Sequence, residues 1–388
     1  FSHNDRNREH NLNIRRIVTD SAGNKTYFNQ YSSLPSDHHN NSYRLGADYE
    51  LTSKNKVGFL VNGYFNNEQD INTNKTFVGT QPGVTDSYLN TLSEIDQSYH
   101  NFALNLNDKL EIDTSGQQLT VDLDYSKFNN NSIAHYDTYF YLPDGSTQMP
   151  PNLLKNQTPS NITIRTAKVD YTLPINKGLK LETGFKLSGV KTDNNLQAQK
   201  QVGGKFVNDS TLTNRFVYDE KIDAGYVNLT RNFKNTSVQA GVRAEYTSSM
   251  GDLITSKEVV SRHYLNFFPS VFINHTINDK NEIGLNYSRR IDRPGYDDLN
   301  PFVYYLDQYT YQKGNPFLNP QYTNNFELNY TYNHTINLSI GYSRTTDVIT
   351  QILETDPVSK ATFQTNLNLQ TQNSYNININ SPFTINSW

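Results

Sequence analysis

The chain has 388 residues, 35% of them hydrophobic, and its mean hydropathy is −0.73. No stretch approaches 18 consecutive apolar residues, which excludes a membrane protein built from spanning helices. The net charge of −4 does not indicate nucleic-acid binding, and the absence of cysteine excludes a disulfide framework and a Cys-based zinc site. The composition is compatible with membrane-spanning strands, because only every second side chain of such a strand meets lipid.

Alternation of apolar and polar residues predicts strands along most of the chain. Tyr43, Leu45 and Leu51 share one face of a predicted strand, and Arg44 and Glu50 share the other. This period of two is typical of strands with one apolar and one polar face, and it recurs at 119–125, 167–173, 179–187, 238–246, 326–332 and 336–342. In a membrane we expect Val238, Val242, Tyr246, Leu328, Tyr330 and Ile340 to face lipid. We expect Arg243, Glu245, Glu327 and Asn337 to face a wet lumen.

Short and long connections alternate along the sequence. Short turn-rich breaks occur at 53–56, 113–116, 174–178, 233–236, 277–281 and 333–335. Long polar stretches lie between them, at 67–96, 129–161, 192–214, 249–261, 290–322 and 346–360. The apolar rows are about 9–12 residues long, near the length that a tilted strand needs to cross a membrane. The pattern predicts an all-β fold, an antiparallel transmembrane β-barrel with short periplasmic turns at one end and long extracellular loops at the other.

We expect one outer-membrane β-barrel domain over residues 1–388, with no internal boundary. About 14 strands are predicted from residue 42 onward, fewer than a large closed barrel contains. Residues 1–41 are expected to form an extracellular loop or hairpin that turns near Asn24-Lys25. The first residues lack the apolar core of a signal peptide. We therefore interpret the chain as part of a larger barrel, truncated at both ends.

Three blocks in residues 288–320 together resemble a signature of the outer-membrane β-barrel family of TonB-dependent receptors that is common in Bacteroidetes. They read Ser-Arg-Arg-Ile-Asp-Arg-Pro (288–294), Leu-Asn-Pro-Phe (299–302) and Gly-Asn-Pro-Phe-Leu-Asn-Pro (314–320). Residues 46–49 and 240–246 are similar to further segments of the family. The resemblance covers nearly the whole chain and is weakest before residue 42.

The resemblance implies a receptor in the cell outer membrane of a Gram-negative bacterium, powered through TonB, with a plug domain inside a 22-stranded barrel. The expected partners are outer-membrane lipid and, in the full-length protein, TonB, a plug domain and a small or oligomeric ligand that the sequence does not name. No nucleic-acid partner and no cofactor are expected. The chain shows no TonB box and no plug, so we expect it to be a piece of the barrel alone.

The motif residues have assignable physical roles. The four prolines cannot continue a strand ladder and stiffen a loop, and Gly314 can adopt a positive φ beside Asn315. Arg289, Arg290 and Arg293 are expected to pair with Asp292, Asp297 or Asp298, or to face a plug or ligand. The family-motif residues with an expected structural role are Pro294, Asn300, Pro301, Phe302, Gly314, Asn315, Pro316, Pro320 and Glu327. The candidate ligand contacts are Arg290, Arg293, Tyr304, Tyr305, Tyr309 and Tyr311, although tyrosines of such a loop more often pack within it or join an interface belt.

No catalytic motif is recognisable in the sequence, which lacks Gly-x-Ser-x-Gly, a phosphate loop and His-Glu-x-x-His. His38 and His39 are adjacent on a predicted strand, so they point in opposite directions and are poorly placed to share a metal ion. The aspartates at 292, 297, 298 and 307 have the oxygen ligands that calcium prefers, but a solvated acidic loop is the favoured interpretation. We predict no catalytic, metal or cofactor site, and a protein that is not an enzyme.

The leading functional hypothesis is therefore a TonB-dependent uptake receptor for an unidentified ligand. The alternative is a passive outer-membrane pore or surface adhesin without TonB coupling. Two further classes stay open on the residues alone. One is a barrel that hydrolyses lipids or peptides, since catalytic triads need not be local in sequence. The other is a soluble β-sandwich binding module, since 27 tyrosines also suit ordinary strands.

Overall fold

A computed structural model describes residues 1–356 and 358–382, most of which belong to one sheet. Its strands are β1 (Ser2–Thr19), β2 (Lys25–Thr52), β3 (Asn55–Gly79), β4 (Ser87–Glu111), β5 (Gln118–Tyr141), β6 (Thr147–Asn176), β7 (Leu179–Val202), β8 (Lys205–Asn208), β9 (Asn214–Asn232), β10 (Thr236–Leu253), β11 (Glu258–Asn278), β12 (Asn281–Asp292), β13 (Val303–Asp307), β14 (Thr310–Lys313), β15 (Gln321–Tyr332), β16 (Ile336–Thr355) and β17 (Thr362–Asn380). A single turn of helix, α1 (Tyr296–Leu299), lies between β12 and β13. In the described residues, no helix is long and apolar enough to cross a membrane.

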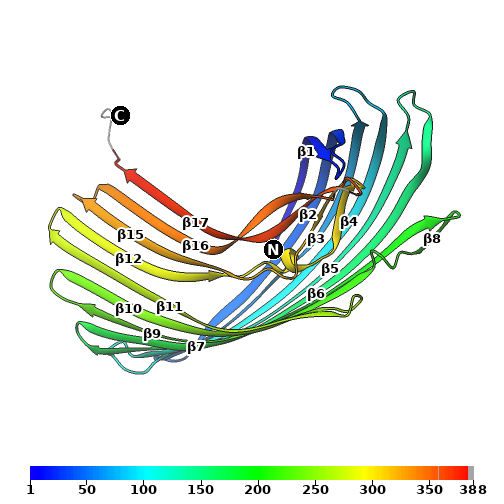
Figure 1. Cartoon of the computed structure of the whole chain (residues 1–388). Helices are drawn as coiled ribbons and strands as arrows, with labels where there is room; N and C mark the ends of the chain where they lie inside the picture. Colours follow the sequence, from blue (N-terminus) through cyan, green and yellow to red (C-terminus); the bar gives the residue numbers. More distant parts are fainter. Residues whose placement is uncertain (357, 383–388) are drawn as a thin grey trace, which may run out of the picture.

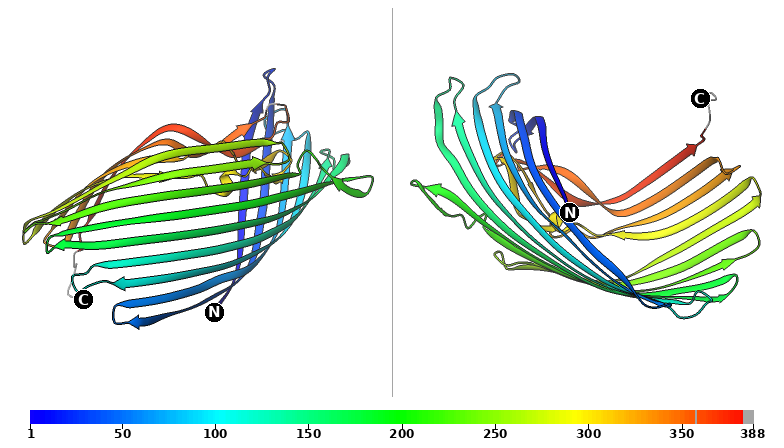
Figure 2. Two further views of the ribbon diagram at one scale, coloured as in Figure 1. Left: turned by 90° about the horizontal axis from the view of Figure 1, so that it is seen from below. Right: turned by 180° about the vertical axis from the view of Figure 1, so that it is seen from behind.

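The long strands form an antiparallel meander. Within the described residues, each long strand from β1 to β16 pairs with the next long strand in the sequence, so that β7 pairs with β9 and β12 with β15. The sheet curves into a deep trough (Figures 1 and 2), and its described residues show no pairing of β1 with β17. The predicted all-β antiparallel fold is confirmed, and the sheet is open rather than closed.

The six predicted short turns lie at one end of the trough, as expected. These turns are alternate connections of an antiparallel meander, so strand pairing places them at the same end. Backbone hydrogen bonds also link neighbouring turns. Glu111 N donates to Lys54 O at 2.7 Å, Asn232 N to Gly178 O at 2.7 Å, and Asn333 N to Lys280 O at 2.6 Å. Figure 2 shows these turns together at one end, opposite the longer hairpins.

The prediction of long loops at the other end was wrong in most places. Except for 290–322, the long polar stretches are largely strands, so that β6 alone has 30 residues and only short connections such as 142–146 join the hairpins. The predicted strand length therefore matches only the apolar part of each strand. The polar part, which continues the same strand toward the long hairpins, was not predicted as strand. Asn, Ser, Thr and Gln side chains are polar on both faces there, so no apolar alternation marks the strand, while backbone pairing continues.

The predicted facing of β10 is confirmed by side-chain exposure. Val242 is 40% exposed and Tyr246 is 47% exposed on the convex face, whereas Glu245 and Thr247 are buried on the concave face. On β15 and β16, Ile340 is also exposed, and Glu327 accepts hydrogen bonds from Asn286 and Asn329 on the inner side. The sheet thus has an apolar outer belt and a polar inner face.

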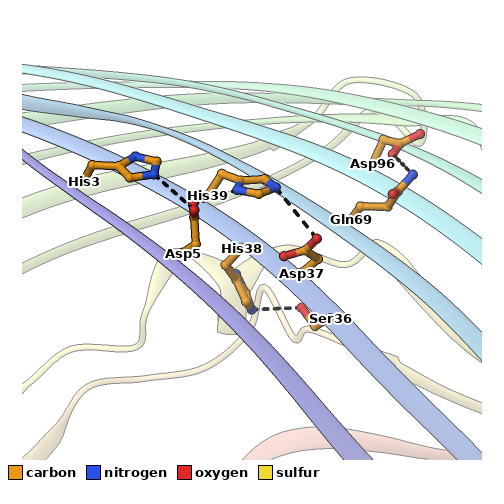
Figure 3. Close-up of polar contacts among 8 residues, drawn as sticks. All are labelled: His3, Asp5, Ser36, Asp37, His38, His39, Gln69 and Asp96. Carbon is orange, nitrogen blue, oxygen red and sulfur yellow. Dashed lines mark hydrogen bonds and ion pairs between the residues drawn. The ribbon is translucent and has the colours of Figure 1, made fainter.

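Residues 1–41 form β1 and the first part of β2, a much longer hairpin than the one predicted around Asn24-Lys25. Between Tyr43 and Asp37 of β2, the outer face of this hairpin carries His3, Asp5, Asp37 and His39 (Figure 3). Asp5 receives hydrogen bonds from the rings of His39 at 2.8 Å and His3 at 3.1 Å. His38 instead contacts Ser36 at 2.8 Å. The two adjacent histidines therefore have separate surroundings, as the alternation of a strand requires.

Candidate functional site

The connection between β12 and β15 lies inside the trough. Residues 293–320, here called the inner segment, contain α1, β13 and β14 and run over the concave face of the sheet (yellow to orange in Figures 1 and 2). Its contacts reach β10 on one side of the trough and β3 on the other. The segment that carries the sequence motif is therefore a lumen element rather than a free extracellular loop.

Local sequence explains how the inner segment turns. Gly295 N donates to the Asp298 side chain at 2.9 Å, Asn300 N donates to Tyr296 O at 3.1 Å, and Phe302 N donates to the Asn300 side chain at 3.2 Å. These bonds satisfy backbone groups at both ends of α1. Pro294 and Pro301 flank the turn of helix, where no strand ladder has to continue.

Gly314 has a different role from the one predicted. Its φ is outside the left-handed region, and the reason for glycine is close approach. A Cβ there would lie 2.6 Å from Asp298 O and 2.8 Å from Asp297 O, and closer still to Asn300 O. Gly314 N donates to Asn300 O at 3.0 Å, and Asn315 N donates to Asp298 O at 2.6 Å. The Gly-Asn pair thus closes the inner segment onto α1.

An apolar cluster fixes the inner segment to the wall. Leu299, Phe302 and Leu318 are at most 3% exposed. They pack with four buried residues of β7, β9 and β10, namely Leu196, Phe216, Tyr218 and Leu253. Burial of a large apolar side chain stabilises by about 1.5–3 kcal/mol, so these three residues hold the inner segment in place.

The arginines bond to the wall and not to the nearby aspartates. Arg293 donates from Nη2 to Glu245 at 2.7 Å and to Thr247 at 3.0 Å, both on β10. Arg289 donates to Phe267 O at 3.2 Å. Strand alternation places Arg290 on the lumen side, exposed and without an ion-pair partner among the described residues. The prediction that ion pairs within the loop hold it together was wrong, because the curvature of the sheet brings β10 closer.

Asp307 attaches the inner segment to the side of the trough opposite β10. It is 1% exposed, and its carboxylate accepts hydrogen bonds from Thr76 at 2.6 Å and Asn74 at 2.8 Å, both on β3. Arg16 of β1 donates to Tyr309 O at 2.7 Å. The four predicted aspartates are not gathered, and the described residues contain no group of three or more acidic or histidine side chains placed to hold a metal ion.

Three of the candidate tyrosines are packed against the wall. Tyr309 contacts Phe28 with ring centroids 5.2 Å apart, Tyr305 contacts Tyr136 at 6.1 Å, and Tyr311 stacks on Phe363 at 5.2 Å. Such pairs contribute about 0.5–1.5 kcal/mol beyond simple burial. Their geometry supports the packing interpretation that the sequence also allowed.

Tyr304 is different, because half of its surface is exposed and it lines a cavity of about 380 Å³ between the inner segment and the wall. Desolvation of its hydroxyl group, together with the carboxylate of Asp297, raises the pKa of Tyr304 to about 12, so it stays a neutral donor and acceptor. The wall contributes Tyr99, Asn130 and Asn194, among other polar residues. The buried Oδ1 of Asn130 has no hydrogen-bond partner in the described residues.

Sequence inspection did not single out these wall residues. Asn130 on β5 and Asn194 on β7 lie in polar continuations that were predicted as loops, whereas Tyr99 on β4 lies just beyond the predicted loop 67–96. Period-two alternation could have placed each on the lumen face, but nothing local in the sequence indicates which of them the inner segment reaches. The site depends on contacts between strands that are far apart in the chain.

An antiparallel meander with an apolar outer belt, a polar lumen face and an inward-folded connection defines an outer-membrane β-barrel protein. Residues 110–388 match the model of the outer membrane protein beta-barrel family, and the chain belongs to that family. The protein is therefore located in the outer membrane of a Gram-negative bacterium. A comparison with curated proteins gives no match.

Two solved structures share the fold at low identity. Against the RagAB peptide transporter, the TM-score is 0.55 at 12% identity, covering 94% of this chain and 48% of the other. Against the copper transporter OprC, the TM-score is 0.50 at 12% identity, covering 99% and 60%. The hemophore receptor HasR of Serratia marcescens, as a double mutant, gives a TM-score of 0.48 at 11% identity, covering 96% and 61%. The chain spans less than two thirds of each of these proteins.

Proposed function

We propose that the chain forms part of the wall of a TonB-dependent receptor that takes up a ligand across the outer membrane. Family membership supports this role, and RagAB and OprC, whose fold the chain shares, are both transporters by name. The observation that carries the proposal is the inner segment, which lies across the trough and leaves a polar cavity beside Tyr304. Binding and passage of a ligand, rather than bond-making, are the chemistry of such a site.

The proposal includes closure of the sheet. An open trough would leave unpaired strand edges in lipid, at residues 43–52 of β2 and along β17, and exposed backbone groups there would cost several kcal/mol each. We propose that residues 1–388 form a single barrel domain and that the long strands described here belong to a closed barrel of 22 strands. In the full-length receptor, a plug domain would occupy the trough beside the inner segment and would be moved through TonB.

The cavity favours an uncharged polar ligand. Its described lining consists mainly of Asn, Gln, Ser, Thr and Tyr, with Asp297 as its single charged residue and no Lys or Arg. Amide and hydroxyl groups donate and accept hydrogen bonds without selecting a charge. The half-exposed Tyr304 ring offers a flat apolar surface. Of the predicted ligand contacts, Tyr304 and Arg290 remain available, while Arg293, Tyr305, Tyr309 and Tyr311 are engaged with the wall.

Uptake by whole cells tests the proposal. Cells that express the full-length protein, with TonB intact or deleted, would be given radiolabelled probes: a ferric siderophore, cyanocobalamin, a peptide and a neutral oligosaccharide. We expect saturable uptake of one probe that is lost without TonB. Uptake that is not saturable and is equal in both strains would indicate a passive pore, and the receptor proposal would be wrong.

A further inference from the structure

The upper edge of the apolar outer belt can be located from strand register. Tyr43 on β2 lies opposite Gly63 on β3, and Phe102 on β4 lies opposite Gly63 on the other side. Tyr125 on β5 lies one row nearer the short turns, and these aromatic side chains are followed by polar residues such as Asn129 and Asn131. Aromatic side chains concentrate at the two membrane interfaces of a barrel. This level therefore corresponds to the headgroup region on the side of the long hairpins.

Four basic residues occupy the same level on the neighbouring strands. Lys127 on β5 and Lys191 on β7 both lie opposite Thr163 of β6. In the adjacent row, Arg165 on β6 and Lys221 on β9 both lie opposite Gly189 of β7. Because neighbouring strands are about 4.8 Å apart, the four side chains cover one compact area. We call this surface the basic interface patch.

The four basic side chains are exposed, and none has an ion-pair partner within 4.0 Å among the described residues. Three acidic residues lie nearby. Asp193 is already bound by Arg215, with N–O distances of 2.9 and 2.6 Å. Asp219 lies opposite Lys191, and Asp223 lies opposite Leu187, one row further into the apolar belt. Four cations thus face two carboxylates that form no ion pair in the described residues, which leaves an excess of positive charge.

The centre of the patch is open. Gly189 lies between Arg165 and Lys221, and a Cβ at this position would meet nothing within 4 Å. An anion seated above Gly189 would be reached by cations from strands on both sides. Like charges at this spacing repel one another where screening is weak, and a bound anion removes that cost. Phosphate is a suitable anion, since Arg and Lys both bind it through charge-assisted hydrogen bonds.

We propose that the basic interface patch, formed by Lys127, Arg165, Lys191 and Lys221, binds the phosphorylated headgroup of a lipid in the outer leaflet. The side with long hairpins faces the exterior in barrels of this class, so the patch lies at the level of outer-leaflet headgroups. Basic side chains at a membrane surface attract anionic lipid headgroups. The lipid would bind at the outer surface of the wall, independently of any ligand in the lumen.

Native mass spectrometry of the full-length protein in detergent tests the proposal. The probes are purified lipid A, dephosphorylated lipid A and inorganic phosphate. We expect the wild type to retain lipid A, and the variant K127Q/R165Q/K191Q/K221Q to bind it at least tenfold more weakly. The matched control K54Q/K177Q/K234Q/K280Q removes the same charge at the short turns and should bind as the wild type does.

Gly189→Leu provides a second variant that changes no charge. It fills the open centre of the patch and should also weaken binding of lipid A at least threefold, while heat-modifiable migration on gels confirms a folded barrel. Equal lipid A binding by the wild type and both patch variants would overturn the proposal. So would equal binding of dephosphorylated lipid A, or displacement of lipid A by millimolar inorganic phosphate, which would make free phosphate the ligand.

Discussion

Arg293 and Glu245 are 48 residues apart in the sequence and are joined by a 2.7 Å hydrogen bond between guanidinium and carboxylate. Glu245 also accepts a 2.6 Å hydrogen bond from Arg243 on the same strand. The side chains of Arg293 and Glu245 are only 21% and 11% exposed. This contact connects the start of the inner segment to the lumen face of β10, and it gives the motif arginine a structural role.

Loss of this contact should loosen the inner segment without unfolding the sheet. In Arg293→Ala, Glu245 keeps Arg243 as a partner, so we expect a loss of about 1.5–3 kcal/mol in the local stability of residues 293–320. Hydrogen exchange of the segment in detergent micelles measures this loss. Arg290→Ala is the control, because Arg290 is exposed and makes no ion pair in the described residues. Equal exchange in the two variants would show that the contact does not hold the segment.

Gly314→Ala should be costly for steric reasons. The added Cβ meets three backbone carbonyl oxygens, at Asn300, Asp298 and Asp297, and backbone cannot move aside as a side chain can. We expect about 1–3 kcal/mol of local destabilisation, seen as faster proteolysis between α1 and β15. Gly189→Ala, with open space around the new Cβ, should leave proteolysis unchanged. Similar behaviour of the two variants would refute the close-approach explanation.

The assignment of faces predicts that an added charge destabilises the outer face of β10 more than its lumen face. Val242→Arg places a charge in the middle of the outer belt and should cost about 2–4 kcal/mol, whereas Gln239→Arg on the lumen side should be mild. Urea unfolding of the protein folded into lipid vesicles measures the difference. If both substitutions were tolerated equally, the convex face would not be the lipid face.

The contacts on the outer face of β1 and β2 predict that the stability of this edge of the sheet depends on pH. His3 donates hydrogen bonds to Asn41 and Asp5, which raise its pKa from 6.5, and the hydrogen bond that His39 donates to Asp5 raises the pKa of His39 from 6.5. His39 in turn lowers the pKa of Asp5 from 3.8. The contribution of His3 and His39 to the stability of this edge is fully present below pH 6.5 and is lost as pH rises through the raised pKa values. The Asp5 contribution is present above pH 3.8 and is lost as pH falls through the lowered pKa.

Protection of residues 2–10 against hydrogen exchange, corrected for intrinsic rates, should therefore be greater at pH 5.5 than at pH 8.5. The variant Asp5→Asn removes the carboxylate that both rings share and should reduce this difference, while Asn41 still bonds to His3 (Figure 3). A pH effect of the same size in wild type and Asp5→Asn would assign it to other groups.

The sequence predicts the parts of the fold that local periodicity encodes. Val242 and Glu245 could be placed on opposite faces because each strand alternates, and the turn at 113–116 could be assigned to one end because connections alternate in length. The long hairpins could not be predicted, because both faces of their strands carry polar residues such as Asn130 and Asn194. The sequence there has no alternation of apolar and polar residues. Backbone pairing, which has no residue signature there, forms those strands.

The site depends on contacts that no local pattern encodes. Asp307 accepts a hydrogen bond from Thr76, which is 231 residues away, and only the curvature of the sheet brings the two together. The motif residues could be identified as a structured segment, but their position in the lumen could not. For the same reason the tyrosines could not be divided into Tyr304, which lines the cavity, and those that pack on the wall.

Uptake by the full-length receptor that lacks residues 304–312 tests whether the inner segment forms the ligand site. This deletion removes Tyr304 and the attachment through Asp307, while Leu299, Phe302 and Leu318 keep their buried contacts. We predict that the barrel still inserts, judged by surface labelling and heat-modifiable migration, and that TonB-dependent uptake of the probe carried by the wild type falls at least tenfold. Unchanged uptake by the inserted deletion variant would contradict this prediction and would place the ligand site outside the inner segment.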